Sequence, residues 1–259
     1  MELKTLLYEK EGALSIITLN RPKTMNAIDG ELIQELIRVL DDIADDAQAR
    51  AVIIAGSEKV FAAGGDIGFM LKAQPLDGEQ FVESVKKAFT KIEALNQPVI
   101  AAISGMALGG GCELALACDL RIAAEGTIFG QPEINLGIIP GAGGTQRLTR
   151  AVGPGWAKHL VMTGLTIDTE MAFKIGLVTR VVPKENLMAE AKKMGVLLAG
   201  KSPVAMKAAK NCINLGQNVD LLSGLHYESK SLAFLFSTED KTEGMTAFLE
   251  KRKPDFKGR

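Results

Sequence analysis

The chain has 259 residues, of which 47% are hydrophobic and 24% are charged, and its formal net charge is −1 at pH 7. This length and composition are ordinary for a globular protein with one main core. The small net charge excludes broad electrostatic attraction to nucleic acid or to an anionic membrane. The three cysteines and two histidines form no metal-ligand or disulfide pattern, so we expect no metal site. Without a signal-peptide or membrane-span pattern, we expect a cytoplasmic protein.

Strands and helices are predicted to alternate through the first part of the chain, which favours an α/β architecture with buried strands. Apolar residues recur at helical spacing from Glu31 to Ile43, and Asp29 just before them is a candidate N-cap. The predicted strands are Leu3–Tyr8, Ala13–Leu19, Ala51–Ala55, Val99–Ile103 and Leu120–Ala123, the first two forming a hairpin, and further helices are predicted over Glu79–Leu95 and Gly111–Cys118.

Residues 130–145 are rich in loop-forming residues, and the pattern beyond Gly153 is mostly helical. A shift in composition near residues 200–203 marks the candidate boundary between an α/β core (1–200) and a helical C-terminal region (201–259). The helices predicted after Gly153 are Trp156–Thr163, Thr169–Ile175, Glu185–Leu198, Pro203–Leu215, Leu221–Phe236 and Lys241–Lys251.

The segment with most chemical content is the glycine triplet Gly109–Gly111, which follows a predicted strand and precedes Glu113 at the start of a predicted helix. Glycines there allow close approach of the backbone to a ligand and direct N–H groups at it. Two structural alternatives stay open: close packing of helix against strand, and for Glu113 a simple complement to the helix dipole. A phosphate-binding loop is disfavoured because no Lys-Ser or Lys-Thr follows the glycines.

Several segments taken in order resemble the enoyl-CoA hydratase (crotonase) family along nearly the whole chain. The resemblance implies a spiral of ββα units as the core, and a helical C-terminal region that supports trimers and dimers of trimers, hence a homohexamer, and closes the active site. The matching segments are 20–27, 61–67, 98–113, 129–133, 140–150 and 245–253.

The same resemblance implies an acyl-CoA ligand whose thioester oxygen is held by the backbone N–H groups of Gly65 and Gly110. The family often has Ala where this chain has Gly65, which matters little because the donor is the main chain. Glu113 is expected to act as the base that activates water and Glu133 as the acid that protonates the α-carbon. Sequence spacing alone does not place these two carboxylates together.

The further substrate contacts expected are less specific, and each has a structural alternative. Asp66 is more simply the cap of a following helix, Gly141 is equally explained by turn geometry, and the basic tail with Phe256 and Lys257 by a solvated chain end. The full set of expected substrate-binding residues is Ala63, Gly64, Asp66, Ile67, Gly141, Phe256 and Lys257.

The activity implied is reversible syn addition of water to a short-chain trans-2-enoyl-CoA such as crotonyl-CoA, in fatty-acid oxidation or butyrate-type metabolism, giving 3-hydroxyacyl-CoA without a metal or redox cofactor. Glutamates at both 113 and 133 favour hydration over the family's other acyl-CoA reactions, which are double-bond isomerisation, decarboxylation, dehalogenation and thioester hydrolysis. A non-enzymatic RNA-binding relative is the alternative of another class, and the near-neutral charge argues against it.

Overall fold

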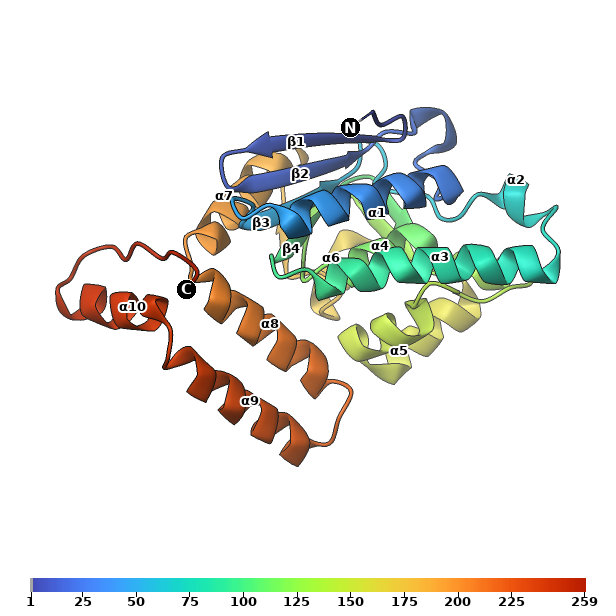
Figure 1. Cartoon of the computed structure of the whole chain (residues 1–259). Helices are drawn as coiled ribbons and strands as arrows, with labels where there is room; N and C mark the ends of the chain where they lie inside the picture. The colour runs from blue at the N-terminus through green and yellow to red at the C-terminus, as the bar shows by residue number, and fades with distance from the viewer. Residues whose placement is uncertain (1) are drawn as a thin grey trace.

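A six-stranded sheet forms the centre of the computed structural model, which describes residues 2–259 (Figure 1). β1 and β2 pair antiparallel as the predicted hairpin, and every later neighbour in the sheet pairs parallel. The sequence therefore predicted this hairpin and the three following strands correctly, although the first strand begins later than expected. The strands, in sheet order, are β1 (Leu6–Glu11), β2 (Leu14–Leu19), β3 (Ala51–Ala55), β4 (Val99–Ile103), β6 (Leu120–Ala124) and β9 (Arg180–Val182).

A second layer of short pairings turns this sheet into a spiral. It comprises the three-stranded sheet of β5 (Met106–Leu108), β7 (Ile128–Gly130) and β8 (Thr166–Ile167), and single bridges join Ile28 to Gly65 and Ala62 to Ala107. Each turn of the chain thus runs through a strand of the large sheet, a short pairing of the second layer and then a helix. The ββα spiral expected from the sequence is confirmed.

Both faces of the large sheet are covered by helices, which explains its continuous apolar strands. Alternate residues of β3 divide between the faces: Val52 and Ile54 pack with one cluster, and Ile53 packs with the other. α1 (Gly30–Asp45), α3 (Pro75–Ala94) and α4 (Gly110–Ala117) cover the first face, whereas α7 (Leu187–Ala199) covers the second. The predicted cap of α1 is present, since Asp29 Oδ1 accepts a hydrogen bond from Leu32 N at 2.9 Å.

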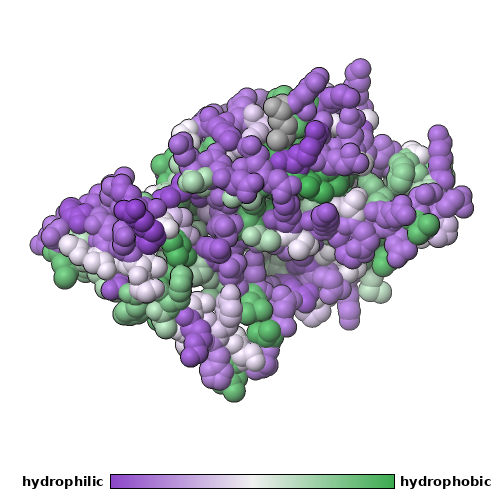
Figure 2. Space-filling model, viewed as in Figure 1, coloured by the Kyte–Doolittle hydropathy of each residue, from purple (hydrophilic) through white to green (hydrophobic). Residues whose placement is uncertain are grey.

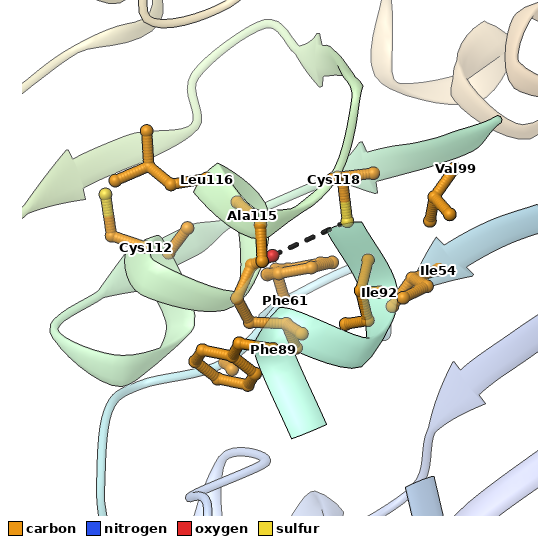
Figure 3. Packing of buried hydrophobic residues seen from close by; sticks show 14 of the residues in the cluster. Ile54, Phe61, Phe89, Ile92, Val99, Cys112, Ala115, Leu116 and Cys118 are labelled. Carbon is orange, nitrogen blue, oxygen red and sulfur yellow. Dashed lines mark hydrogen bonds between the residues drawn. The ribbon is translucent and has the colours of Figure 1, made fainter. Parts of the chain in front are cut away.

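Large apolar side chains surround α4 and hold it in place. Figure 3 shows Phe61 and Phe89 beneath this helix, with Cys112 and Cys118 toward its two ends. The Cys118 thiol donates to the Leu114 carbonyl at 3.5 Å. Close packing on this scale leaves a helix little freedom to shift, so the start of α4 is a rigid platform.

The C-terminal helices project from this core as a separate layer, as Figure 1 shows in orange and red.

The long helix after residue 148 starts earlier than predicted, because Gly153 (φ +78°) and Pro154 kink one continuous segment rather than preceding it. The remaining helices and turns are η1 (Pro22–Thr24), α2 (Ile67–Met70), η2 (Pro132–Leu136), η3 (Gly144–Leu148), α5 (Thr149–Thr163), α6 (Thr169–Lys174), η4 (Lys184–Asn186), α8 (Pro203–Gly216), α9 (Leu221–Leu235) and α10 (Glu239–Leu249).

Lys210 attaches this C-terminal layer to the core. The side chain lies on α8, is 8% exposed, and donates from Nζ to the carbonyls of Ile92 and Gln97 at 3.2 and 3.1 Å. A third bond reaches Asp119 Oδ2 at 2.7 Å. Because a buried ammonium is stable only with its partners in place, these contacts set where α8 meets the core.

Candidate active site

Two glycine loops meet at the start of α4. A Cβ added to Gly110 would lie 3.6 Å from Gly65 N, and one added to Gly109 would lie 3.7 Å from Gly64 Cα. Gly64 and Gly109 have φ of +113° and +51°, a region that favours glycine. Both distances are ordinary van der Waals contacts, so the two loops lie against each other, and the positive φ at Gly64 and Gly109 is what calls for glycine there.

This approach leaves two backbone donors beside each other. Ile28 N donates to Gly64 O, and Asp66 N donates to Ile28 O. The N–H of Gly65, which lies between Gly64 and Asp66, takes no part in these two hydrogen bonds. Gly110 is the first residue of α4, where an N–H has no partner within the helix. Within residues 2–259, neither N–H donates to another group of the chain. Lying at the positive end of α4, both are suited to a negatively charged oxygen.

Glu113 lies one turn into α4 with a buried and firmly held carboxylate. The residue is 3% exposed, and its Oε1 accepts hydrogen bonds from Ala142 N at 2.8 Å and Gly144 N at 2.7 Å. Burial raises the pKa of Glu113 above its ordinary value, while these two N–H groups and the positive charge of Arg147 oppose that rise. The second carboxylate oxygen, Oε2, accepts no hydrogen bond from residues 2–259 and is the one available to a water molecule.

Glu133 reaches the same place from η2, the turn that follows β7. Its Oε1 would be only 2.7 Å from a Cβ on Gly109, so the carboxylate rests against the glycine loop. The amide of the fully buried Gln131, turned with its nitrogen toward Glu133, donates to Oε1 and Oε2 at 3.1 and 3.2 Å. Burial, together with the negative charge of Glu113, raises the pKa of Glu133 to about 7. The carboxyl can therefore hold or release a proton near neutral pH.

Cys112 lies beside both carboxylates, and its thiol stays in the neutral form. Burial first, and then the charges of Glu113 and Glu133, raise the pKa of its thiol to about 12. A neutral thiol that is 1% exposed packs as a small apolar group.

The other residues expected near the substrate divide into two groups: five that lie in the loop of Gly65 or in the loop that holds Glu113, and two in the C-terminal tail. Ala63, Gly64, Asp66 and Ile67 share the loop of Gly65, although the Asp66 carboxylate caps α2 by accepting from Phe69 N at 3.0 Å. Gly141 belongs to the loop that holds Glu113, and a Cβ there would lie 3.2 Å from Val82 of α3.

Phe256 and Lys257 lie elsewhere in this chain. Arg50, at the amino end of β3, donates from Nη2 to the Phe256 carbonyl at 3.1 Å, and Lys257 N donates to Asp240 Oδ1 at 2.7 Å. The glycine loop containing Gly65 follows the opposite, carboxyl end of β3, and Figure 1 places the C-terminus far from α2. Contact with CoA from this tail would have to be made to the site of a neighbouring copy, and it stays a prediction.

Sequence reasoning missed two side chains that support the carboxylates. Gln131 and Arg147 both stand inside the matching segments, but nothing in their spacing shows that Gln131 bonds Glu133 or that Arg147 lies near Glu113. Residues 2–259 contain no group of three or more His, Cys, Asp or Glu side chains placed to hold a metal ion. In the same part of the chain, no helix combines the length and apolarity needed to cross a bilayer.

Two backbone N–H donors, one buried carboxylate that accepts two N–H hydrogen bonds and a second carboxyl whose pKa lies at about 7 make up a site suited to acid–base chemistry beside an oxygen that gains negative charge. A ββα spiral carrying such a site is the class of protein that the resemblance to the enoyl-CoA hydratase (crotonase) family implies.

Comparison with known proteins agrees with this class. The family described as enoyl-CoA hydratase/isomerase matches residues 9–259, and the chain belongs to that family. A short-chain-enoyl-CoA hydratase of Clostridium acetobutylicum is 46% identical, and a crotonyl-CoA hydratase of Syntrophomonas wolfei is 45% identical; these alignments cover 100% and 99% of both chains. The crystal structure of enoyl-CoA hydratase from Bacillus anthracis superposes with a TM-score of 0.96 at 41% identity, covering 99% of this chain and 100% of that one. The family and the enzyme class, a hydro-lyase, expected from the sequence are confirmed.

Proposed function

We propose that this hydro-lyase adds water reversibly to short-chain trans-2-enoyl-CoA thioesters and that crotonyl-CoA is a preferred substrate. The single observation that carries the proposal is the convergence of Gly65 N–H, Gly110 N–H, Glu113 and Glu133 at the start of α4. The names of the two bacterial relatives supply the chain length, since both refer to short enoyl chains.

In the proposed reaction the thioester oxygen lies between the N–H groups of Gly65 and Gly110. Attack of water on the β-carbon builds negative charge on this oxygen, and donors already directed at it lower the barrier by about 2.7–4 kcal/mol each. These donors are backbone groups on a rigid platform, so they need no reorganisation as the charge develops.

Proton movement is assigned to the two carboxylates. Glu113 accepts a proton from the attacking water, because two N–H donors favour its charged form and Oε2 remains open. Glu133, whose pKa lies at about 7, gives a proton to the α-carbon. These two environments support the base role for Glu113 and the acid role for Glu133, and CoA enters only as part of the substrate.

We further propose that the protein works as a homohexamer in the cytoplasm. Large apolar side chains are exposed on the projecting helices, and Figure 2 shows apolar surface at the tip of the α8–α9 hairpin. A monomer rarely exposes so many. In a dimer of trimers, α8–α10 would cover one another and would bring Phe256 and Lys257 to a neighbour's site. The exposed residues are Ile213, Leu221, Leu222, Leu225, Leu232, Phe234, Phe236, Met245, Phe248 and Leu249.

The test is a spectrophotometric hydration assay on trans-2-enoyl-CoA thioesters of four to ten carbons. We expect the highest kcat/KM at four carbons, with 3-hydroxybutyryl-CoA as product. Inactivity on every length would shift the assignment to another acyl-CoA reaction of the family. Light scattering of the same preparation measures the mass of the assembly and decides between a hexamer and smaller species.

A further inference from the structure

Arg147 stands behind the loop that holds Glu113 and is fastened at three points. Its Nε donates to Oε1 of Glu93 and its Nη2 donates to Oε2, both at 2.7 Å, and Glu93 lies in the last turn of α3. The third guanidinium nitrogen, Nη1, donates at 2.7 Å to the carbonyl of Ala142. All three guanidinium nitrogens are thereby hydrogen-bonded, and these bonds hold the guanidinium in one orientation.

The Ala142 carbonyl lies between the two N–H groups that bind Glu113. Ala142 N comes just before it in the chain and Gly144 N comes two residues later, and both donate to Glu113 Oε1. Gly143 between them has φ +116°, and a Cβ there would lie 2.1 Å from Arg147 Nη1, so the guanidinium packs directly on the backbone. This loop then enters η3, a π-helical turn of a kind often found at functional sites.

We propose that Arg147, oriented by Glu93, is a positioning residue for Glu113: by holding the Ala142 carbonyl it keeps both loop N–H groups on Oε1 and leaves Oε2 directed at the attacking water. The inference rests on the proposed hydration, in which Glu113 is the base. Arg147 itself touches no reacting atom and acts only through the loop and through its charge.

The electrostatics of the site point the same way. Burial raises the pKa of Glu113, and the positive charge of Arg147 opposes this rise together with the two loop N–H groups. The titratable groups facing Glu113 from other directions are Cys112 on α4 and Glu133 on η2, both of which sense its negative charge. Glu93 faces Arg147 from the other side. Removing the guanidinium should therefore raise the pKa of Glu113.

Three substitutions separate geometry from charge. Arg147→Gln removes both the guanidinium hydrogen bonds and the positive charge. Arg147→Lys keeps the positive charge without the guanidinium geometry. Glu93→Gln keeps the shape of the partner of Arg147 while removing its negative charge. Arg150→Gln is the matched control, because Arg150 lies one turn later, is exposed, and within residues 2–259 bonds only Gln146 and Asn218. The Arg147–Glu93 pair borders a solvent cavity of about 820 Å³, so these changes leave no sealed void.

The experiment measures kcat, KM and the pH dependence of kcat/KM for crotonyl-CoA hydration by the full-length protein, with a melting temperature for each variant. We expect Arg147→Gln to lose about 10–100-fold in kcat with little change in KM. Its acidic limb should also move to higher pH, since the carboxylate form of Glu113 is lost at a higher pH without the cation. Arg147→Lys should lose kcat with a smaller shift of this limb. Arg150→Gln should behave as the wild type.

Equal rates and an unmoved acidic limb in Arg147→Gln and Arg150→Gln would overturn the proposal. If Arg147→Gln fails to fold, Arg147→Lys and Glu93→Gln decide: a kcat like that of the wild type in both rejects the positioning role. A wild-type enzyme that hydrates no enoyl-CoA would instead reject the proposed function, so the two failures are distinguishable. The double variant Glu93→Gln/Arg147→Gln should be no slower than Arg147→Gln alone, because Glu93 acts on Glu113 only through Arg147 and its hydrogen bond to the Ala142 carbonyl.

Discussion

Replacing Gly109 by alanine tests the contact on which the placement of Glu133 depends. The new Cβ would lie 2.7 Å from Glu133 Oε1, whereas ordinary contact begins at about 3.4 Å, so the carboxylate must retreat by about 0.7 Å. Because a misplacement of about 1 Å can cost about 100-fold in rate, we expect kcat to fall by about 10–100-fold, or about 1.4–2.7 kcal/mol of barrier. The backbone at φ +51° and ψ −124° adds a stability cost of about 1–3 kcal/mol.

Gly126→Ala is the matched control for this strain. Gly126 also has positive φ (+75°), but a Cβ there has nothing within 4 Å. Both variants should lose a few degrees of melting temperature, and only Gly109→Ala should lose kcat in the crotonyl-CoA assay. If Gly109→Ala kept the kcat of Gly126→Ala, catalysis would not need the carboxylate of Glu133 against the glycine loop.

Three further outcomes are expected. The pH dependence of kcat/KM should be bell-shaped with an alkaline limb near pH 7, because Glu133 acts as an acid and loses its proton as the pH rises through its pKa of about 7; Glu133→Gln should remove this limb. Lys210→Met should destabilise the protein by about 3 kcal/mol in urea unfolding, since it leaves Asp119 without its buried partner, whereas Met at the exposed Lys207 should change little. Asp29→Ala should cost about 1 kcal/mol, measured as a fall in melting temperature, through loss of the α1 cap, and an unchanged melting temperature would show that the cap contributes nothing.

The sequence predicted the parts of the fold that depend on local patterns. The amphipathic spacing of α1, its Asp29 cap and the apolar runs of β3 and β4 each carry their own signal. The short strands β5, β7 and β8 were missed because two or three residues show no periodicity and pair only when the spiral closes. The kink at Gly153 concealed the start of α5, since the sequence cannot show that a helix resumes in line after a break.

The site shows the same division between local and long-range information. The glycine triplet and Glu113 are readable as a loop and a helix start, whereas the meeting with Glu133 came only from the family resemblance. The fork of Arg147 on Glu93 joins residues 54 apart in sequence, and its contact with the Ala142 carbonyl depends on the shape of the 140–144 loop. No local spacing encodes such a contact, and only the folded chain reveals it.

The central claim is that two carboxylates beside a pair of N–H donors carry out the hydration. The measurement that tests it most directly is the rate of crotonyl-CoA hydration by Glu113→Gln and Glu133→Gln, each compared with the wild type at matched folded fraction. A glutamine keeps the size of the side chain but cannot carry the proton, so each variant should lose about 10²–10⁴-fold in kcat. Rates like that of the wild type in both variants would contradict the claim.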